Sequence, residues 1–189
     1  NHNIIHRDLK PDNIFISETD TDETVHVKVL DFGIAKFDAI DGTGKSVMQT
    51  MPGTIMGTPA YMPPEQIRSS DKVDHRADLY SLGAVLYFML TGHSPFGRGV
   101  DQIGEYFARV LTESVPEIDR KINPRLSTII YRLLEKSPDL RFQTADQLLV
   151  AVDGLLNSYS DSESEPKGTS GESSDQRPDR PSVVAGERK

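Results

Sequence analysis

The sequence predicts a mainly α-helical fold with one small β-hairpin. Near the N-terminus, two short runs rich in β-branched residues are separated by a polar turn, which is typical of a hairpin. After residue 78, four longer segments carry apolar residues at helical spacing. Such segments are typical of helices that pack around a common core.

The predicted hairpin pairs residues 13–16 with residues 25–30 around a polar turn at residues 17–24. The second run alternates apolar and polar residues with period two, as a half-buried strand does. Antiparallel pairing would place Asn13 at the entrance of the hairpin and Asp31 just past its exit, so that both side chains come to the same end. A metal ion could bridge an amide oxygen and a carboxylate placed there.

The elements that follow are a long loop and four helices. Residues 34–62 show no sustained periodicity, so we expect a functional or disordered loop. Residues 78–91 are apolar nearly all round and predict a helix in the middle of the core, ended by Gly92. Thr144 and Gln147 resemble a capping box at the start of the last helix. The three amphipathic helices are predicted over residues 103–111, 126–134 and 144–155.

The composition changes abruptly after Leu156, where Ser, Glu, Asp, Pro and Gly dominate. A segment with so few apolar residues cannot offset the entropy of ordering by burial. We therefore expect one domain over residues 1–156 and a disordered tail over residues 157–189.

Charge and cysteine content exclude several classes of function. The formal net charge of −8 argues against nucleic acid as a general partner, because phosphate backbones need a basic face. The absence of cysteine excludes disulfides, thiolate metal sites and cysteine nucleophiles. With no signal peptide and no apolar run of membrane length, we expect a cytoplasmic location.

The most informative stretch of the chain is His-Arg-Asp-Leu-Lys-Pro-Asp-Asn at residues 6–13, followed by Asp-Phe-Gly at residues 31–33. An Asp, a Lys and an Asn on one short loop, with a second Asp downstream, supply a base, a cation and oxygen ligands for a metal. These groups are needed to move a phosphoryl group from a nucleotide to a hydroxyl.

These motifs resemble those of bacterial eukaryotic-like (Hanks-type) serine/threonine protein kinases. The segment Gly-Thr-Pro-Ala-Tyr-Met-Pro-Pro-Glu-Gln at residues 57–66 extends the resemblance. Several motifs in the order of the family, spread over residues 3–156, make the resemblance specific. It implies a kinase-like C-terminal lobe that uses ATP and Mg²⁺ and transfers the γ-phosphate to Ser or Thr of protein substrates.

The resemblance also implies catalytic and cofactor-binding roles for single residues. Asp8 matches the catalytic aspartate that accepts the proton of the substrate hydroxyl, and Lys10 matches the lysine that neutralises the γ-phosphate. Asn13 and Asp31 match the metal ligands and, with Lys10, would bind the nucleotide. Thr58 matches the threonine that helps to place the substrate hydroxyl.

Four further residues are expected to support the site. His6 is expected to pack under the metal-binding motif, and Glu65 is expected to pair with Arg141. Asp78 matches the aspartate that binds the backbone of the catalytic loop. A carboxylate at a helix N-terminus is also favoured by the helix dipole alone, and this simpler explanation of Asp78 stays open.

Arg7 suggests regulation by phosphorylation. An arginine beside the catalytic aspartate can hold a phosphorylated activation loop through bidentate bonds. We therefore expect activity to rise when Thr50 or Thr54 is phosphorylated, with Ser46 as a weaker candidate. The simpler interpretation, that these are ordinary loop hydroxyls, stays open.

The motifs of a kinase N-terminal lobe are not found in the sequence. A Gly-rich phosphate loop, a strand lysine and an adenine-binding hinge are all lacking, and five residues precede His6. We therefore expect a C-terminal lobe with the N-terminal lobe missing, and negligible catalysis by these residues alone. Two alternatives stay open: a non-catalytic module that docks partners through residues 103–112, and a separate chain that supplies the upstream lobe. A membrane-anchored parent and dimerisation of that parent also stay open.

Overall fold

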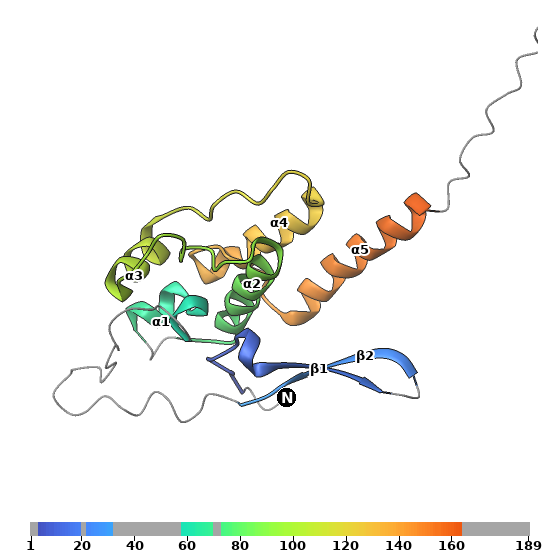
Figure 1. Cartoon of the computed structure of the whole chain (residues 1–189), viewed down its shortest axis with the longest axis horizontal. Coiled ribbons are helices and arrows are strands. Elements are labelled where there is room, and N and C mark those ends of the chain that lie inside the picture. The colour runs from blue at the N-terminus through green and yellow to red at the C-terminus, as the bar shows by residue number, and fades with distance from the viewer. Residues whose placement is uncertain (1–3, 20–21, 32–57, 70–72, 164–189) are drawn as a thin grey trace, which may run out of the picture.

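The computed structural model of the chain describes residues 4–19, 22–31, 58–69 and 73–163 (Figure 1). With η for a short 3₁₀ helix, the elements are η1 (Pro11–Asn13), β1 (Ile14–Thr19), β2 (Asp22–Val29), η2 (Thr58–Tyr61), α1 (Pro64–Arg68), α2 (Arg76–Thr91), α3 (Ile103–Thr112), α4 (Pro124–Leu133), η4 (Pro138–Leu140) and α5 (Ala145–Glu163). Across these ranges, none of the helices is long and apolar enough to cross a membrane.

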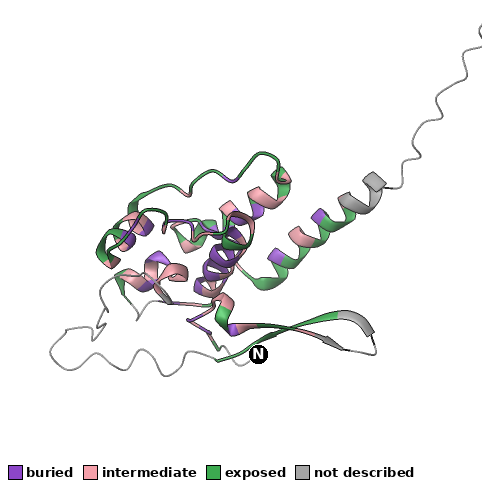
Figure 2. Cartoon of the chain, viewed as in Figure 1, coloured by how far each residue is buried: buried purple, intermediate pink, exposed green. Residues whose placement is uncertain are grey.

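The hairpin predicted from the sequence is present as an antiparallel pair of strands. Strand β1 faces β2 through the pairs Ile14 with Val29 and Ile16 with Val27. The strands run further into the polar turn than predicted, because the ladder continues to Thr19. The side chains of Ile16 and Val27 are exposed, and the hairpin projects from the helices (Figure 2). The hairpin therefore meets the rest of the chain mainly at its base.

Helix α2 lies among the other helices, and buried residues gather along it (Figures 1 and 2). It begins at Arg76, two residues before the predicted start. It ends where Gly92 adopts a φ of 77° and donates its N–H to the Phe88 carbonyl at 2.8 Å, a conformation that glycine reaches without strain. Phe88 and Met89 are exposed, so the helix is not buried all round as its sequence predicted.

Two hydrophobic clusters form the core, and α2 contributes to both. The first joins α2, α3 and α4 and contains Tyr80, Ala84, Tyr87, Phe96, Val100, Tyr106, Val110, Ile118, Ile130 and Leu134. The second joins α2, α4 and α5 and contains Leu79, Ile129, Leu133, Phe142, Leu148 and Leu155. The members from α3, α4 and α5 occupy positions that the apolar periodicity predicted, so the prediction of these three helices is confirmed. In α2 the first cluster is formed by Tyr80, Ala84 and Tyr87, which the apolar pattern did not single out.

Polar residues fix where the later helices begin. In α4, Asn123 caps the first turn by accepting the N–H of Arg125 at 2.8 Å. In α5, Thr144 accepts the N–H of Gln147 at 3.2 Å, which is half of the predicted capping box. The Gln147 side chain instead accepts the N–H of Gln143 at 2.9 Å. Helix α5 continues to Glu163, into the predicted tail, whose residues 164–189 lie outside the described part of the chain.

A close approach between α2 and α4 requires glycine at position 83. A Cβ added there would lie 2.6 Å from the Cβ of Leu133, so one helix would have to shift. We expect Gly83→Ala to lower the free energy of unfolding by about 1–3 kcal/mol, measured by urea denaturation. The matched control is Gly154→Ala in α5, where an added Cβ meets no atom within 4 Å. This control should be neutral or stabilising by up to about 1 kcal/mol. Equal stability of Gly83→Ala and the wild type would contradict the close approach.

Lys136 carries a buried charge without a hydrogen-bond partner among the described residues. Its Nζ lies 3.9 Å from the centre of the Phe96 ring, and burial lowers the pKa of Lys136 from 10.5 to about 8. Between these two pH values the unfolded chain binds more protons than the folded chain, so this group makes stability rise with pH.

Lys136→Met should therefore raise the free energy of unfolding at pH 7. We expect a gain of about 1 kcal/mol, because the lost cation–π contact and partial hydration offset much of the desolvation cost. The gain should shrink as the pH approaches 10.5, the ordinary pKa of lysine. Urea denaturation of the wild type and of Lys136→Met at neutral and alkaline pH measures this gain. A gain that does not change with pH would contradict the lowered pKa of Lys136.

Candidate active site

Asp8, Lys10 and Asn13 lie together where the predicted catalytic motif meets the base of the hairpin. The Nδ2 of Asn13 donates to the carbonyl oxygen of Asp8 at 2.8 Å and to its Oδ2 at 3.4 Å. The Nζ of Lys10 lies 3.3 Å from the same Oδ2. The Asp8 side chain is only 4% exposed. The structure thus brings a base, a cation and an amide from the predicted motif into one buried cluster.

The local sequence explains how Asn13 reaches back to Asp8. Pro11 is the first residue of η1, a position that suits proline because its fixed φ matches the turn and no N–H is needed there. The turn is closed by the N–H of Asn13, which donates to the Lys10 carbonyl at 3.0 Å. The Asn13 side chain therefore returns toward the residues just before the turn.

His6 and Asn13 fix the end of β2 beside this cluster. The N–H of Leu30 donates to the Asn13 carbonyl at 2.8 Å. The Leu30 carbonyl lies 2.9 Å from the Nε2 of His6, and the Nδ1 of His6 accepts the N–H of Asp8 at 3.3 Å. Both His6 bonds form when the neutral ring carries its proton on Nε2. Asp31 follows Leu30 directly and so starts next to the cluster of Asp8, Lys10 and Asn13.

The backbone of the predicted catalytic loop is strained at Arg7 and is held there by Asp78 and Gln66. Arg7 has a φ of 63°, a left-handed conformation that costs about 1–3 kcal/mol for a residue other than glycine. The Asp78 carboxylate accepts the N–H groups of His6 and Arg7, each at 2.9 Å. Gln66 donates to the Arg7 carbonyl at 3.3 Å. Asp31, with a φ of 55°, is the second strained residue of the motif.

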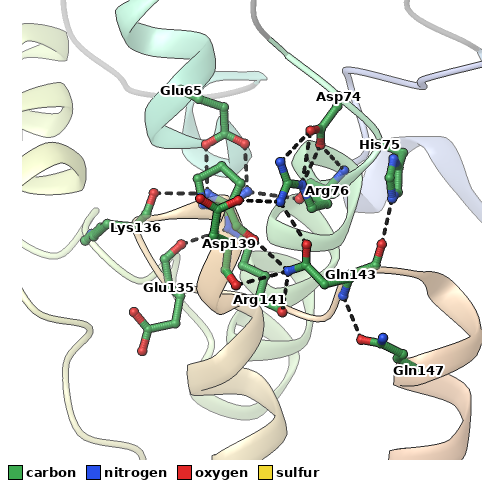
Figure 3. A network of polar contacts seen from close by, with 11 residues as sticks. Glu65, Asp74, His75, Arg76, Glu135, Lys136, Asp139, Arg141, Gln143 and Gln147 are labelled. Carbon is green, nitrogen blue, oxygen red and sulfur yellow. Dashed lines mark hydrogen bonds and ion pairs between the residues drawn. The ribbon is translucent and has the colours of Figure 1, made fainter.

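Glu65 and Arg141 form a buried ion pair (Figure 3). Both terminal nitrogens of Arg141 donate to the Glu65 carboxylate, each at 2.7 Å. The Nε donates to the Glu135 carbonyl at 2.8 Å, and Nη1 also donates to the Arg76 carbonyl at 2.9 Å. The guanidinium is fully buried, so its hydrogen bonds replace those that water would make.

Three residues that contribute to this arrangement were not predicted from the sequence. Gln66 holds the Arg7 carbonyl, as described above. Ser81 donates to the Tyr61 carbonyl at 2.8 Å, and Tyr106 donates to the Ala60 carbonyl at 2.7 Å, so both hold η2. A serine within an otherwise apolar helical stretch was the available signal for Ser81. The other two carry no local signal.

The predicted loop residues are placed only in part. Thr58 is the first residue of η2. The proposed phosphorylation sites Thr50, Thr54 and Ser46 lie outside the described residues, and their role stays a prediction.

The donors around Asn13 fit a hard cation. Within the described ranges, no group of three or more His, Asp or Glu residues is placed to hold a metal. The Nδ2 of Asn13 is used by Asp8, which leaves the amide oxygen as the atom of this side chain that a metal would bind. In the predicted site the Asp31 carboxylate would be the second protein ligand, and both donor atoms would be oxygen. Mg²⁺ fits such a set because it keeps several water or phosphate ligands.

Comparison with known proteins assigns the family. The protein kinase domain family matches residues 1–151. Serine/threonine-protein kinase PknB of Mycolicibacterium smegmatis is 44% identical over 149 residues, covering 78% of this chain and 22% of the relative. Serine/threonine-protein kinase pkn3 of Myxococcus xanthus is 42% identical over 158 residues, covering 79% of this chain and 28% of the relative. The chain thus spans less than a third of the length of these relatives, and the resemblance to bacterial serine/threonine kinases is confirmed.

One prediction from the sequence is corrected by this comparison. We expected a C-terminal lobe alone with the N-terminal lobe missing, but the family match begins at the first residue and runs over residues 1–151 without division into lobes. The described part also contains a two-stranded sheet beside its helices. The lobe assignment relied on motifs that were not found, and a motif that is lacking does not define a domain boundary. The chain belongs to the protein kinase domain family.

Proposed function

We propose that this chain carries the catalytic loop of a serine/threonine protein kinase, which transfers the γ-phosphate of ATP to Ser or Thr hydroxyls of proteins. One observation carries the proposal: Asp8 is buried within hydrogen-bonding distance of Lys10 and Asn13 on a single loop. A carboxylate suits this reaction as a base, because the hydroxyl becomes acidic only as transfer proceeds.

Each residue of the loop takes a separate task in this proposal. Asp8 orients the substrate hydroxyl and accepts its proton. Lys10 carries its charge next to the Asp8 carboxylate, where it would neutralise the γ-phosphate. The oxygens of Asn13 and Asp31 would hold Mg²⁺, which would supply positive charge to the phosphates of ATP. Thr58 helps to place the hydroxyl that attacks the γ-phosphorus of ATP, from which ADP leaves.

Regulation and location belong to the same proposal. Arg7 pairs with a phosphate on Thr50 or Thr54, which orders the activation loop and raises activity. The substrates are proteins rather than nucleic acids, in keeping with the net charge of −8. The kinase acts in the cytoplasm, where ATP is available, and dimerisation would supply a partner for phosphorylation between two copies.

The test is transfer of radiolabel from γ-labelled ATP by the protein produced from its natural gene. With casein as acceptor and Mg²⁺ present, label should appear on phosphoserine or phosphothreonine and be lost when EDTA removes the metal. Absence of label above a reaction without enzyme would reject the proposed function. Label on tyrosine alone would reject its specificity.

A further inference from the structure

Arg76, the first residue of α2, makes hydrogen bonds to three side chains (Figure 3). Its Nε and Nη2 donate to both carboxylate oxygens of Asp74 at 2.7–3.1 Å. Its Nη1 donates to Asp139 at 2.8 Å and to the Gln143 side chain at 2.9 Å. One guanidinium therefore ties the start of α2 to the segment that contains η4.

That segment is itself held in shape by Gln143. The Nε2 of Gln143 donates to the carbonyls of Pro138, Asp139 and Arg141 at 2.9–3.2 Å. Arg141 in turn donates to the Arg76 carbonyl at 2.9 Å. Both the side chain and the backbone of Arg76 are thus bound to residues 138–143, which also supply the arginine of the buried pair with Glu65.

The same helical turn carries the carboxylate that holds the catalytic loop. Asp78 follows Arg76 by two positions and lies in the first turn of α2. Its two oxygens accept the N–H groups of His6 and Arg7. Because both bonds come from one carboxylate, a rotation or shift of this turn would weaken both at once. The left-handed backbone of Arg7 would then lose the contacts that hold it.

Exposure indicates that these ion pairs contribute little to global stability. The Asp139 side chain is 82% exposed and the Asp74 side chain is 45% exposed, and exposed pairs are screened by water. The guanidinium group of arginine is planar, however, so its N–H groups point in fixed directions. It can therefore hold several acceptors in a defined orientation, which a lysine ammonium cannot do. We therefore expect Arg76 to orient the first turn of α2 rather than to stabilise the whole fold.

We propose that Arg76 is a positioning residue for the catalytic loop. By clamping the first turn of α2 onto residues 138–143, it holds Asp78 where that carboxylate keeps the backbone of His6 and Arg7 in place and so presents Asp8. The consequence for catalysis depends on the proposed kinase function, whereas the consequence for the loop backbone does not.

Amide hydrogen exchange of the full chain, followed by NMR, tests the backbone effect without any activity. In Arg76→Gln, the amides of His6 and Arg7 should exchange about ten-fold faster, which corresponds to about 1.4 kcal/mol. The amide of Val110, in the core of α3, should keep its rate and so report unchanged global stability. Arg76→Lys should give an intermediate rate and remains usable if Arg76→Gln does not fold.

Arg109→Gln is the matched control, because Arg109 forms a partly exposed ion pair with Glu105 at 2.8 Å within α3. It should leave the His6 and Arg7 amides unchanged. If neither Arg76 variant speeds exchange of these two amides, or if Val110 speeds up equally, the inference is overturned.

Kinetics provide the second readout. Arg76→Gln should lower kcat about ten-fold with little change in KM for ATP, a loss of about 1.4 kcal/mol in transition-state stabilisation. Combined with Asp78→Asn, it should add almost nothing to the loss caused by Asp78→Asn alone, because both changes act through one contact. Additive losses would overturn the inference. These kinetics use the protein produced from its natural gene; if its wild type is inactive, the proposed function is rejected instead, and hydrogen exchange then decides the role of Arg76.

Discussion

Asp8→Asn is expected to lower kcat for phosphoryl transfer by about 10²–10⁴-fold, the usual contribution of a positioned general base. The change keeps the size of the side chain but removes the carboxylate that we propose accepts the proton. The loop should stay folded, because the strong bond from Asn13 goes to the backbone carbonyl of Asp8 at 2.8 Å. Steady-state kinetics with a protein acceptor measure the loss, and circular dichroism checks the fold.

Asp12→Asn provides a matched control on the same loop. Asp12 is exposed and lies within η1, so its substitution removes the same charge from the same turn. Its kcat should stay within about two-fold of the wild type, since surface changes away from special contacts have small effects. Equal losses in both variants would show that loop charge, rather than the Asp8 carboxylate, supports the reaction.

Arg141→Met should produce the largest loss of stability. It leaves the Glu65 carboxylate without its partner in a site where that side chain is only 15% exposed. It also leaves three backbone carbonyls, those of Arg76, Glu135 and Lys136, without their donor. Breaking a buried pair from one side costs about 3–5 kcal/mol. Urea denaturation should show this loss, or the variant should fail to fold.

Two further variants separate loss of the ion pair from loss of any arginine. Adding Glu65→Leu to Arg141→Met should recover part of the stability, because the unpaired carboxylate is removed. Arg120→Met should have no measurable effect, since its ion pair with Glu117 is exposed on both sides. If Arg141→Met and Arg120→Met were equally stable, the buried pair would have no structural role.

The helices were predictable because their information is local. Residues 103–112 and 124–133 repeat apolar side chains every three to four positions, and these same side chains form the core. Helix α1 has five residues, which is too short for periodicity to appear. The end of α5 was predicted too early, because we ended the helix where apolar residues cease. A lack of apolar residues shows only that a segment is not buried, and polar residues can still extend a helix that has already formed.

The site was predictable where its residues are close in sequence. Asp8, Lys10 and Asn13 share one turn, so their proximity follows from the motif. Contacts across the chain were predictable where the family motifs match them, as for Glu65 with Arg141 and for Asp78 with the backbone of residues 6 and 7. The contact of Gln66 with the Arg7 carbonyl leaves no pattern in either segment. The left-handed backbone of Arg7 could not be predicted either, because arginine has no preference for it and tertiary contacts impose it.

The positive φ angles of Arg7 and Asp31 bear on how this protein would respond to laboratory evolution. Glycine at either position would relieve the backbone cost, so selection for heat resistance alone would reward such replacements. Each would also delete a charged group that the proposed chemistry needs. Replacements at these two positions should therefore raise thermal stability and lower activity. Mutant libraries that are selected for thermal stability should leave both codons unchanged.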